Sequence, residues 1–153
     1  MLVTGGAGYV GSHAVKSLDE AGHTPVVLDN LSAGHRGAVK GAAFIEADVR
    51  NTDDVRSALR EHRVTAVMHF AGVLSVEESV QHPARYYDLN LGGSLSLLEA
   101  MRAEGVRRLV FSSTCAVYGD PVTTPIEENH PTRPINAYGD TKLAVERALA
   151  HYS

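Results

Sequence analysis

Two patterns of apolar residues alternate along this chain. Short apolar runs are typical of buried strands, and they are followed by stretches in which apolar residues recur every three or four positions, as on one face of a helix. The runs predict strands at Leu2–Thr4, Thr24–Asp29, Ala42–Glu46, Ala66–Phe70 and Val106–Ser112. The periodic stretches predict helices at Tyr9 to about Ala21, Thr52–His62, Ser75–Val80, Pro83 to about Glu104 and Asn136–Tyr152. The polar stretches between them, Asn30–Gly41 and Ser113–Pro134, are expected to be loops.

Strands that are apolar on both faces and alternate with helices are typical of a parallel sheet covered on both sides. Right-handed crossovers between such strands give a doubly wound α/β fold of the Rossmann type, whose ligands bind at the carboxyl ends of the strands. We therefore predict one domain of this class over residues 1–153.

The amino-acid composition limits the kinds of partner that the protein is expected to bind and the cellular compartment in which it is expected to occur. The formal net charge of −4 and the lack of a basic stripe argue against a nucleic-acid partner. No apolar run reaches the ~18 residues that would cross a membrane, and no signal peptide is visible. The single cysteine, Cys115, rules out an internal disulfide and favours a cytoplasmic location. We expect Cys115 itself to be a small buried packing residue.

The first strand runs into a glycine-rich segment, Thr-Gly-Gly-Ala-Gly-Tyr-Val-Gly at residues 4–11. Gly5, Gly8 and Gly11 fall three apart, and Gly6 adds the G-x-G-x-x-G spacing. Glycine at these positions allows a sharp strand-to-helix turn, close approach of backbone amides to a diphosphate, and tight helix packing. The N-terminus of the following helix then favours an anion. The alternative is a plain glycine-rich turn without a ligand. The residues further along the chain are needed to decide between the two interpretations.

Acidic residues end the next two strands. Asp29 stands where a carboxylate can accept hydrogen bonds from an adenosine ribose and repel the 2′-phosphate of NADP. Its alternative role is a solvated turn residue. Asp48, followed by Val49, closes the third strand on the same edge and could hold an adenine amino group, or could simply precede a helix.

Phe70-Ala71-Gly72 ends the fourth strand, where small residues would let the backbone run beside a diphosphate and a ribose. The alternative is a strand-to-helix turn that merely needs glycine. Asn90 is polar within a largely apolar helix face. It could be a buried amide that ties loops together or a cofactor contact, and the sequence does not separate the two.

Tyr138 and Lys142 stand four residues apart on the last predicted helix, so both side chains share one face. They follow the fifth strand, whose end carries the hydroxyls of Ser112, Ser113 and Thr114. A hydroxyl from that strand end and a phenol from the next helix can converge over a nicotinamide ring. The Lys142 ammonium would favour the ionised phenolate, and Tyr138 could then act as general base for a sugar hydroxyl.

These segments together resemble the extended short-chain dehydrogenase/reductases, and within them the enzymes that epimerise UDP-sugars. The resemblance rests on ordered matches that cover nearly the whole chain: TGGAGYVGSH at 4–13, LDNL at 28–31, DVR at 48–50, HFAG at 69–72, YYDLN at 86–90, FSSTCAVYG at 111–119 and YGDTK at 138–142.

The resemblance implies a role for each matched residue. It places Tyr9 and Val10 in the phosphate-binding turn, Asn30 with Asp29 on the adenosine ribose, and Asp48 with Val49 on adenine. It places Phe70, Ala71 and Asn90 along the cofactor and Ser112 near the nicotinamide. It makes Thr114 the catalytic hydroxyl, Tyr138 the base, and Lys142 the residue that holds the nicotinamide ribose.

The implied activity is NAD-dependent epimerisation at C4 of a UDP-sugar, between UDP-glucose and UDP-galactose, through a transient 4-keto sugar. A homodimer is possible within this family. Related dehydratases carry an Asp-Glu pair after the catalytic hydroxyl, whereas this chain has Cys115-Ala116, which argues against dehydration. Two alternatives stay open: another extended short-chain reductase or dehydrogenase acting on a nucleotide sugar, and a module that binds NAD without turnover.

Three features depart from the family pattern. Leu74 stands where many epimerases have a lysine, and Glu77 replaces an expected glycine. Family members also run to roughly twice this length, and the additional half forms the nucleotide-sugar pocket. We therefore expect this chain to be the cofactor-binding part of a longer protein.

Overall fold

The computed structural model describes residues 1–152. The chain divides into two compact units. Unit 1 consists of Met1–Gly72 and Ser96–Ser112, and unit 2 consists of Val73–Leu95 and the segment from Ser113 onward. Each unit is described by itself below.

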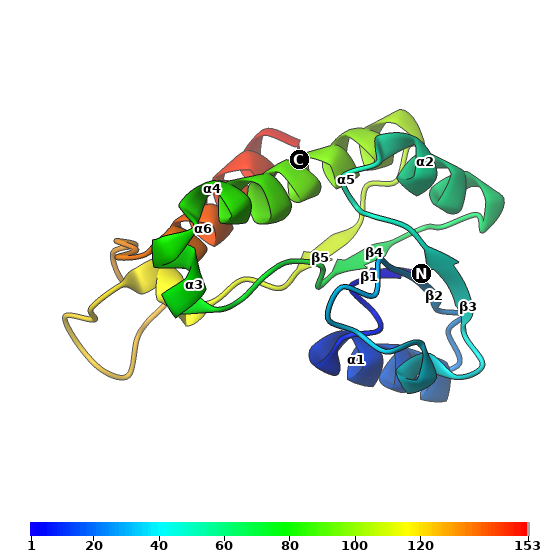
Figure 1. Ribbon diagram of the computed structural model, residues 1–153, viewed down its shortest axis with the longest axis horizontal. Coiled ribbons are helices and arrows are strands. Elements are labelled where there is room, and N and C mark those ends of the chain that lie inside the picture. Colours follow the sequence, from blue (N-terminus) through cyan, green and yellow to red (C-terminus); the bar gives the residue numbers. More distant parts are fainter. Residues whose placement is uncertain (153) are drawn as a thin grey trace. The chain divides into compact units, whose positions relative to one another are not determined.

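Unit 1 is built on a parallel five-stranded sheet in the order β3-β2-β1-β4-β5 (Figure 1). The strands are β1 (Leu2–Thr4), β2 (Val26–Asp29), β3 (Ala43–Glu46), β4 (Val67–His69) and β5 (Leu109–Phe111). Thr4 is in register with Leu28 of β2 and with His69 of β4, so the carboxyl ends of the three central strands are level. This arrangement confirms the predicted parallel α/β fold. β1 has the predicted bounds, and the other four strands begin later or end earlier than the apolar runs suggested.

The two faces of the sheet bury separate apolar clusters, because successive side chains of a strand point to opposite faces. Leu2, Val26 and Leu28 pack with Leu59 and Leu97 on the face covered by α2 (Thr52–Glu61) and α5 (Gly93–Ala103). On the other face, a second cluster is covered by α1 (Tyr9–Glu20) and the short 3₁₀ turn η1 (Arg36–Val39). Its buried members are Val3, Ala7, Val15, Val27 and Val39. The loop predicted over Asn30–Gly41 therefore contains one helical turn.

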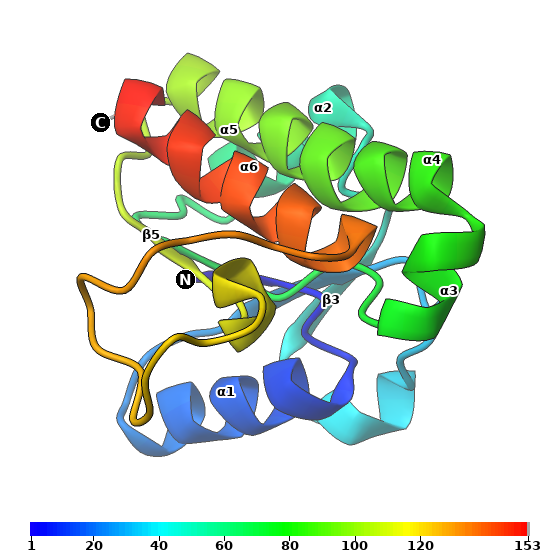
Figure 2. The same ribbon diagram turned by 90° about the vertical axis from the view of Figure 1, so that its left-hand side faces the viewer.

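Unit 2 is helical. Its elements are α3 (Val76–Gln81), α4 (Pro83–Tyr86), the π-helical η2 (Tyr87–Gly92), the 3₁₀ turn η3 (Cys115–Tyr118) and α6 (Ala137–Tyr152). Figure 2 shows α6 running beside the α4–η2 stretch. The single helix predicted from Pro83 to about Glu104 is instead three consecutive helical segments, α4, η2 and α5, and a 3₁₀ turn interrupts the loop predicted over Ser113–Pro134.

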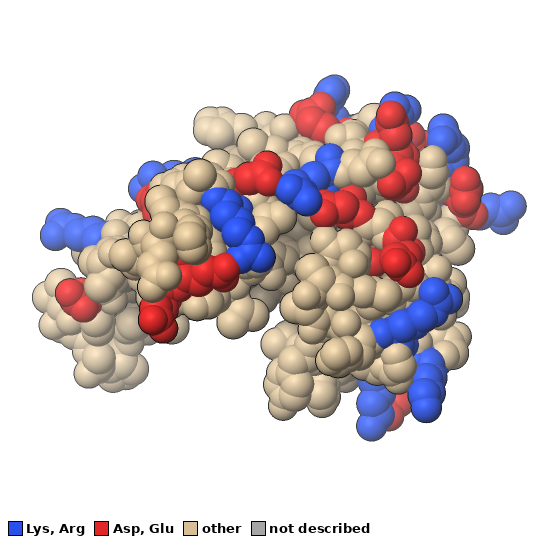
Figure 3. Space-filling view, viewed as in Figure 1, with Lys and Arg blue, Asp and Glu red and all other residues tan. Residues whose placement is uncertain are grey.

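Acidic and basic side chains are interspersed over the face of the molecule shown in Figure 3. Within residues 1–152, no helix is both long enough and apolar enough to span a bilayer.

Candidate active site

The glycine-rich turn of unit 1 is a close backbone crossing. Gly5 has φ +68°, a left-handed conformation that glycine adopts without strain. A Cβ on Gly11 would lie 2.2 Å from the carbonyl oxygen of Gly5, so only glycine lets α1 start this close to the turn. Gly8 is the N-cap residue of α1. The next two side chains, Tyr9 and Val10, are 83% and 58% exposed, so the start of the helix is open to solvent.

Asp29 is held rigidly at the carboxyl end of β2. Its side chain is buried, with 8% exposure, and each carboxylate oxygen accepts a backbone hydrogen bond. Ala7 N–H donates to one oxygen at 3.0 Å and Leu31 N–H donates to the other at 2.8 Å. The carboxylate therefore links the glycine-rich turn to the segment after β2, and the structure brings these two predicted parts together.

Asp48 is surrounded by hydrogen-bond donors. Arg50 donates from its backbone N–H and from both sides of its guanidinium, at 2.8–3.0 Å, and Asn30 Nδ2 donates at 3.0 Å. These bonds, led by the Arg50 side chain, hold the pKa of Asp48 well below its ordinary value. The carboxylate is thus ionised and already bound by protein groups, and its predicted contact with adenine stays a prediction. Val49 is buried beside it.

The segment after β4 lies directly against the glycine-rich turn. A Cβ on Gly5 would come within 2.5 Å of Ala71 N, and Phe70 N–H donates to Thr4 O at 2.9 Å. Gly72 has φ +153°. Ser112, after β5, donates its N–H to His69 O at 3.1 Å. Unit 1 therefore carries predicted residues at the carboxyl ends of all five strands, along one edge of its sheet.

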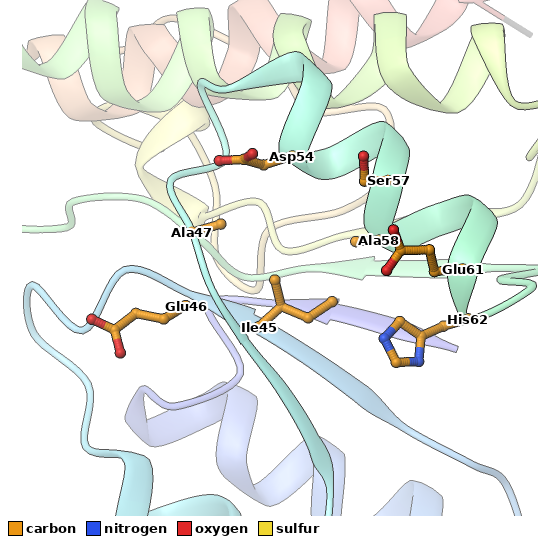
Figure 4. Close-up of a pocket in the computed structure, with 8 residues that line it drawn as sticks. All are labelled: Ile45, Glu46, Ala47, Asp54, Ser57, Ala58, Glu61 and His62. Atoms are coloured by element: carbon orange, nitrogen blue, oxygen red, sulfur yellow. The ribbon is translucent and has the colours of Figure 1, made fainter.

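A separate surface pocket of about 230 Å³ lies between β3 and α2 in unit 1 (Figure 4). It is lined by Ile45, Glu46, Ala47, Asp54, Ser57, Ala58, Glu61 and His62, none of which was a predicted site residue. No group of three or more potential metal ligands occurs within residues 1–152, this pocket included.

In unit 2, α6 carries the predicted phenol and ammonium. The Asn136 side chain accepts the N–H of Gly139 at 2.8 Å, which caps the start of this helix. Tyr138 is half-buried and meets Tyr86 edge-on, with ring centroids 6.5 Å apart and an interplanar angle of 82°. Lys142 is 6% exposed, and its burial lowers the pKa of the ammonium from 10.5 to about 8.

Thr114 stands at the N-cap of η3, where its Oγ1 accepts the N–H of Ala116 at 3.2 Å. The neighbouring Cys115 is exposed. The expectation that this cysteine is a buried packing residue is therefore wrong. It occupies the first position of a short surface turn, and the buried apolar residue of that turn is Val117.

Asn90 lies in the π-helical η2 and is 2% exposed. Its carboxamide accepts from Val73 N–H at 2.8 Å and donates to Val73 O at 3.0 Å and to Thr141 Oγ1 at 3.2 Å. These bonds tie the chain after β4 to α6 and match the structural interpretation of this residue. A contact with a cofactor stays a prediction.

Three contacts on α6 escaped the sequence analysis. Tyr87 donates to Asp140, Ser113 donates to Glu146, and Gly139 packs against the backbone of Ala116. Of these residues, only Glu146 could have been singled out from the sequence, because it follows Lys142 by four residues and therefore lies on the same helix face as Tyr138.

A parallel sheet with a glycine-rich first turn and an acid at the end of β2 defines a fold of the Rossmann type, whose known ligand site lies at the carboxyl ends of the strands. The chain matches the family model described as the NAD dependent epimerase/dehydratase family over residues 1–153, and it belongs to that family. This match confirms the resemblance drawn from the motifs.

Among its curated relatives is the UDP-glucose 4-epimerase of Streptomyces lividans, 53% identical over 150 residues, which cover 97% of this chain and 46% of the relative. Among solved structures, the UDP-glucose 4-epimerase of Brucella ovis in complex with NAD is 46% identical with a TM-score of 0.97. The match covers 99% of this chain and 46% of that one. The Stenotrophomonas maltophila UDP-glucose-4-epimerase, with bound NAD and formylated UDP-arabinopyranose, is 42% identical with a TM-score of 0.94, over 98% and 47% of the two chains. This chain thus spans about half the length of the relatives it matches.

Proposed function

We propose that the protein to which this chain belongs interconverts UDP-glucose and UDP-galactose by NAD-dependent epimerisation at C4. The family membership and the names of the relatives support this activity. The observation that carries it in this chain is the pairing on α6 of a half-buried phenol, Tyr138, with the buried ammonium of Lys142.

Unit 1 fits the adenosine and diphosphate parts of NAD. The crossing at Gly5 and Gly11 leaves no room for a Cβ and exposes the start of a 12-residue helix, as a diphosphate requires. We propose that the cofactor is held by the residues that the sequence marked: Gly5, Gly8, Tyr9, Val10, Gly11, Asp29, Asn30, Asp48, Val49, Phe70, Ala71, Gly72, Asn90, Ser112, Tyr138 and Lys142.

In the proposed mechanism, Tyr138 takes the proton of the sugar 4-hydroxyl and later returns it. Thr114 assists as a hydroxyl donor, since its oxygen already accepts the N–H of Ala116. Lys142 lies on the same face of α6 as Tyr138 and hydrogen-bonds the nicotinamide ribose. When bound, NAD supplies a reversible hydride acceptor, so that a 4-keto sugar can form and be reduced on either face.

The residues after Thr114 argue against water elimination. Cys115 is exposed on the first position of η3, and Ala116 has no ionisable group. Neither supplies the carboxylate pair that dehydratases of the extended family place here. Epimerisation needs no such pair, because the same phenol removes and returns one proton.

The test is Tyr138→Phe in the full-length protein, assayed with UDP-glucose and UDP-galactose. We expect conversion to fall by at least about 10³-fold, because removal of a positioned general base typically costs 10²–10⁴-fold. The affinity for NAD should change less than about tenfold, which corresponds to 1.4 kcal/mol. Tyr152→Phe, at the far end of the same helix, is the matched control. Unchanged conversion in Tyr138→Phe would overturn the assignment.

The same assay separates the alternatives. Accumulation of reduced nicotinamide with an oxidised sugar product would favour a dehydrogenase. Stabilisation by NAD with no turnover of any UDP-sugar would favour a binding module.

Two further proposals concern assembly and location. We propose a homodimer, to which the exposed apolar side chains of Leu74, Val76 and Val80 in unit 2 could contribute surface. Sedimentation that stays monomeric at all concentrations would contradict it. We also propose a cytoplasmic location, which the single cysteine supports because one thiol cannot form an internal disulfide.

A further inference from the structure

Two contacts between α6 and the chain after β5 bracket Thr114. On one side, the hydroxyl of Ser113 donates to the carboxylate of Glu146. On the other, Gly139 lies so close to η3 that a Cβ there would come within 2.5 Å of Ala116 O. Thr114 stands between the first contact and the second, and Tyr138 immediately precedes Gly139. The Thr114 hydroxyl therefore belongs to one of the two segments that these contacts join, the chain after β5, and the Tyr138 phenol belongs to the other, α6.

The Ser113–Glu146 contact is well suited to fix a position. The Ser113 hydroxyl has one hydrogen to donate, and an oxygen of the Glu146 side chain accepts it. Both side chains are half-buried, which limits competition from water. At the other contact, backbone meets backbone, so no side-chain rotation can absorb a shift.

Glu146 also has a defined relation to the catalytic face of α6. Tyr138, Lys142 and Glu146 recur every four residues, which places all three on the same side of the helix. A rotation or slide of α6 that moved the phenol and ammonium would move the Glu146 carboxylate with them. Because the carboxylate holds Ser113, such a motion breaks the bond or carries Thr114 along.

We propose that Glu146 is a positioning residue of the active site. By holding Ser113, it sets the Thr114 hydroxyl relative to Tyr138 and Lys142 on α6. Glu146 itself neither gives nor takes a proton in the reaction. The inference rests on the proposed function, since that function gives Thr114 and Tyr138 their chemical roles.

The experiment compares Glu146→Gln, Glu146→Ala, Ser113→Ala and the double variant Ser113→Ala/Glu146→Ala in the full-length protein. Loss of the bond should lower kcat about tenfold, because small misplacements of reacting groups cost up to 10²-fold. KM for the UDP-sugar and Kd for NAD should stay within about twofold, since neither residue is assigned to binding. The double variant should be no slower than the slower single variant, as expected for partners in one bond.

Glu146→Gln separates the hydrogen bond from the charge. Its amide oxygen still accepts from Ser113, so its kcat should stay within about twofold of the parent. If Glu146→Gln is as slow as Glu146→Ala, the negative charge beside Lys142 matters instead, and the positioning role is overturned. Additive losses in the double variant would overturn it as well. Glu20→Ala, which removes an exposed helix carboxylate of unit 1, controls for general charge effects.

A second readout does not depend on activity. The N–H of Ala116 is bonded to Thr114 Oγ1, so its hydrogen exchange reports whether the Thr114 segment is held. We expect exchange about tenfold faster in Glu146→Ala and unchanged in Glu146→Gln. Unchanged exchange in Glu146→Ala would overturn the inference. If the variants show this exchange pattern but the parent protein converts no UDP-sugar, the proposed function alone is overturned.

Discussion

Lys142 combines a buried position with the positive charge that its proposed role requires. Burial disfavours the ammonium, which is why its pKa falls from 10.5 to about 8. Between these two pH values, the unfolded chain holds a proton that the folded chain has released. The free energy of unfolding therefore rises from pH 8 to pH 10.5, and the full penalty of the buried charge is present below pH 8.

We predict that Lys142→Met stabilises the protein at pH 7 by about 1–3 kcal/mol, because it removes that penalty while filling the same space. It should also abolish the rise in stability above pH 8. Urea unfolding from pH 6 to 10.5 measures both effects, with the exposed Lys40→Met as control. A less stable Lys142→Met variant at pH 7 would show that the ammonium is held by more favourable contacts than its burial costs.

The glycine-rich turn supplies a second prediction at the scale of one residue. A Cβ on Gly11 would lie 2.2 Å from a backbone oxygen, so Gly11→Ala must displace α1 or the turn. We expect a loss of about 1–3 kcal/mol in stability and weaker NAD binding. Gly37→Ala is the matched control, because a Cβ there meets nothing within 4 Å. Thermal unfolding with and without NAD would distinguish them, and equal behaviour of the two variants would refute the steric argument.

At the residue scale, the sequence was most informative where backbone geometry restricts the residue type. The glycine spacing predicted the tight turn, and the apolar run before Asp29 predicted that this residue ends the second strand. The sequence could not show that Arg50 and Asn30 surround Asp48, because side-chain partners depend on rotamers. Cys115 was misjudged because an average tendency to be buried says nothing about a residue that starts a surface turn.

At the element scale, one histidine side chain, His130, hydrogen-bonds two backbone groups of the segment between η3 and α6. His130 Nε2 accepts the N–H of Val122 at 3.0 Å, and its Nδ1 lies 2.9 Å from Pro131 O. A backbone N–H needs an acceptor and a carbonyl needs a donor, so these two bonds place the ring hydrogen on Nδ1.

We predict that ¹⁵N spectra of the neutral His130 ring show the Nδ1–H tautomer. In His130→Ala the N–H of Val122 loses its acceptor, so its hydrogen exchange should be faster than in the parent protein. Detection of the Nε2–H tautomer would contradict the assigned bonds, and unchanged exchange at Val122 in His130→Ala would contradict the hydrogen bond from Val122.

The helices show where periodicity reaches its limit as a predictor. The apolar spacing predicted one helix from Pro83, and the chain is indeed helical along that stretch. The π-helical turn at Tyr87–Gly92 was invisible, because one wider turn barely changes which residues are apolar. This turn brings Asn90 to Val73 and Thr141. These tertiary hydrogen bonds cannot be predicted from the local spacing of apolar residues.

At the scale of the whole molecule, the fold class followed from the alternation of strands and helices, while the division into two units did not. Each unit draws on two separate segments of the chain, and the chain passes from one unit to the other after Gly72, after Leu95 and after Ser112. Such a division depends on which helix contacts which segment. The resemblance carried the function further than the pattern could, because its motifs follow one another in order from residue 4 to residue 142.

At the scale of the whole molecule, the position of Asp29 also leads to a prediction about the choice between NAD and NADP. Both of its oxygens are engaged by backbone N–H groups, at 3.0 Å to Ala7 and 2.8 Å to Leu31, so the carboxylate cannot swing away from an approaching 2′-phosphate. A fixed anion in a buried position repels a second anion strongly. We therefore predict that NAD binds at least about tenfold more tightly than NADP, a difference of about 1.4 kcal/mol.

Calorimetry gives the two dissociation constants, and thermal unfolding gives an independent measure. At a concentration 100 times its Kd, NAD should stabilise the protein by about 2.7 kcal/mol, and NADP at the same concentration by about 1.4 kcal/mol less. Asp29→Asn should narrow this difference, because the neutral amide no longer repels the phosphate. It should also lower stability by about 1–3 kcal/mol, because one carboxamide oxygen cannot match two N–H donors on opposite sides. Equal affinities for NAD and NADP in the parent protein would mean that the bound 2′ position lies away from Asp29, and the proposed placement of the adenosine would fail with it.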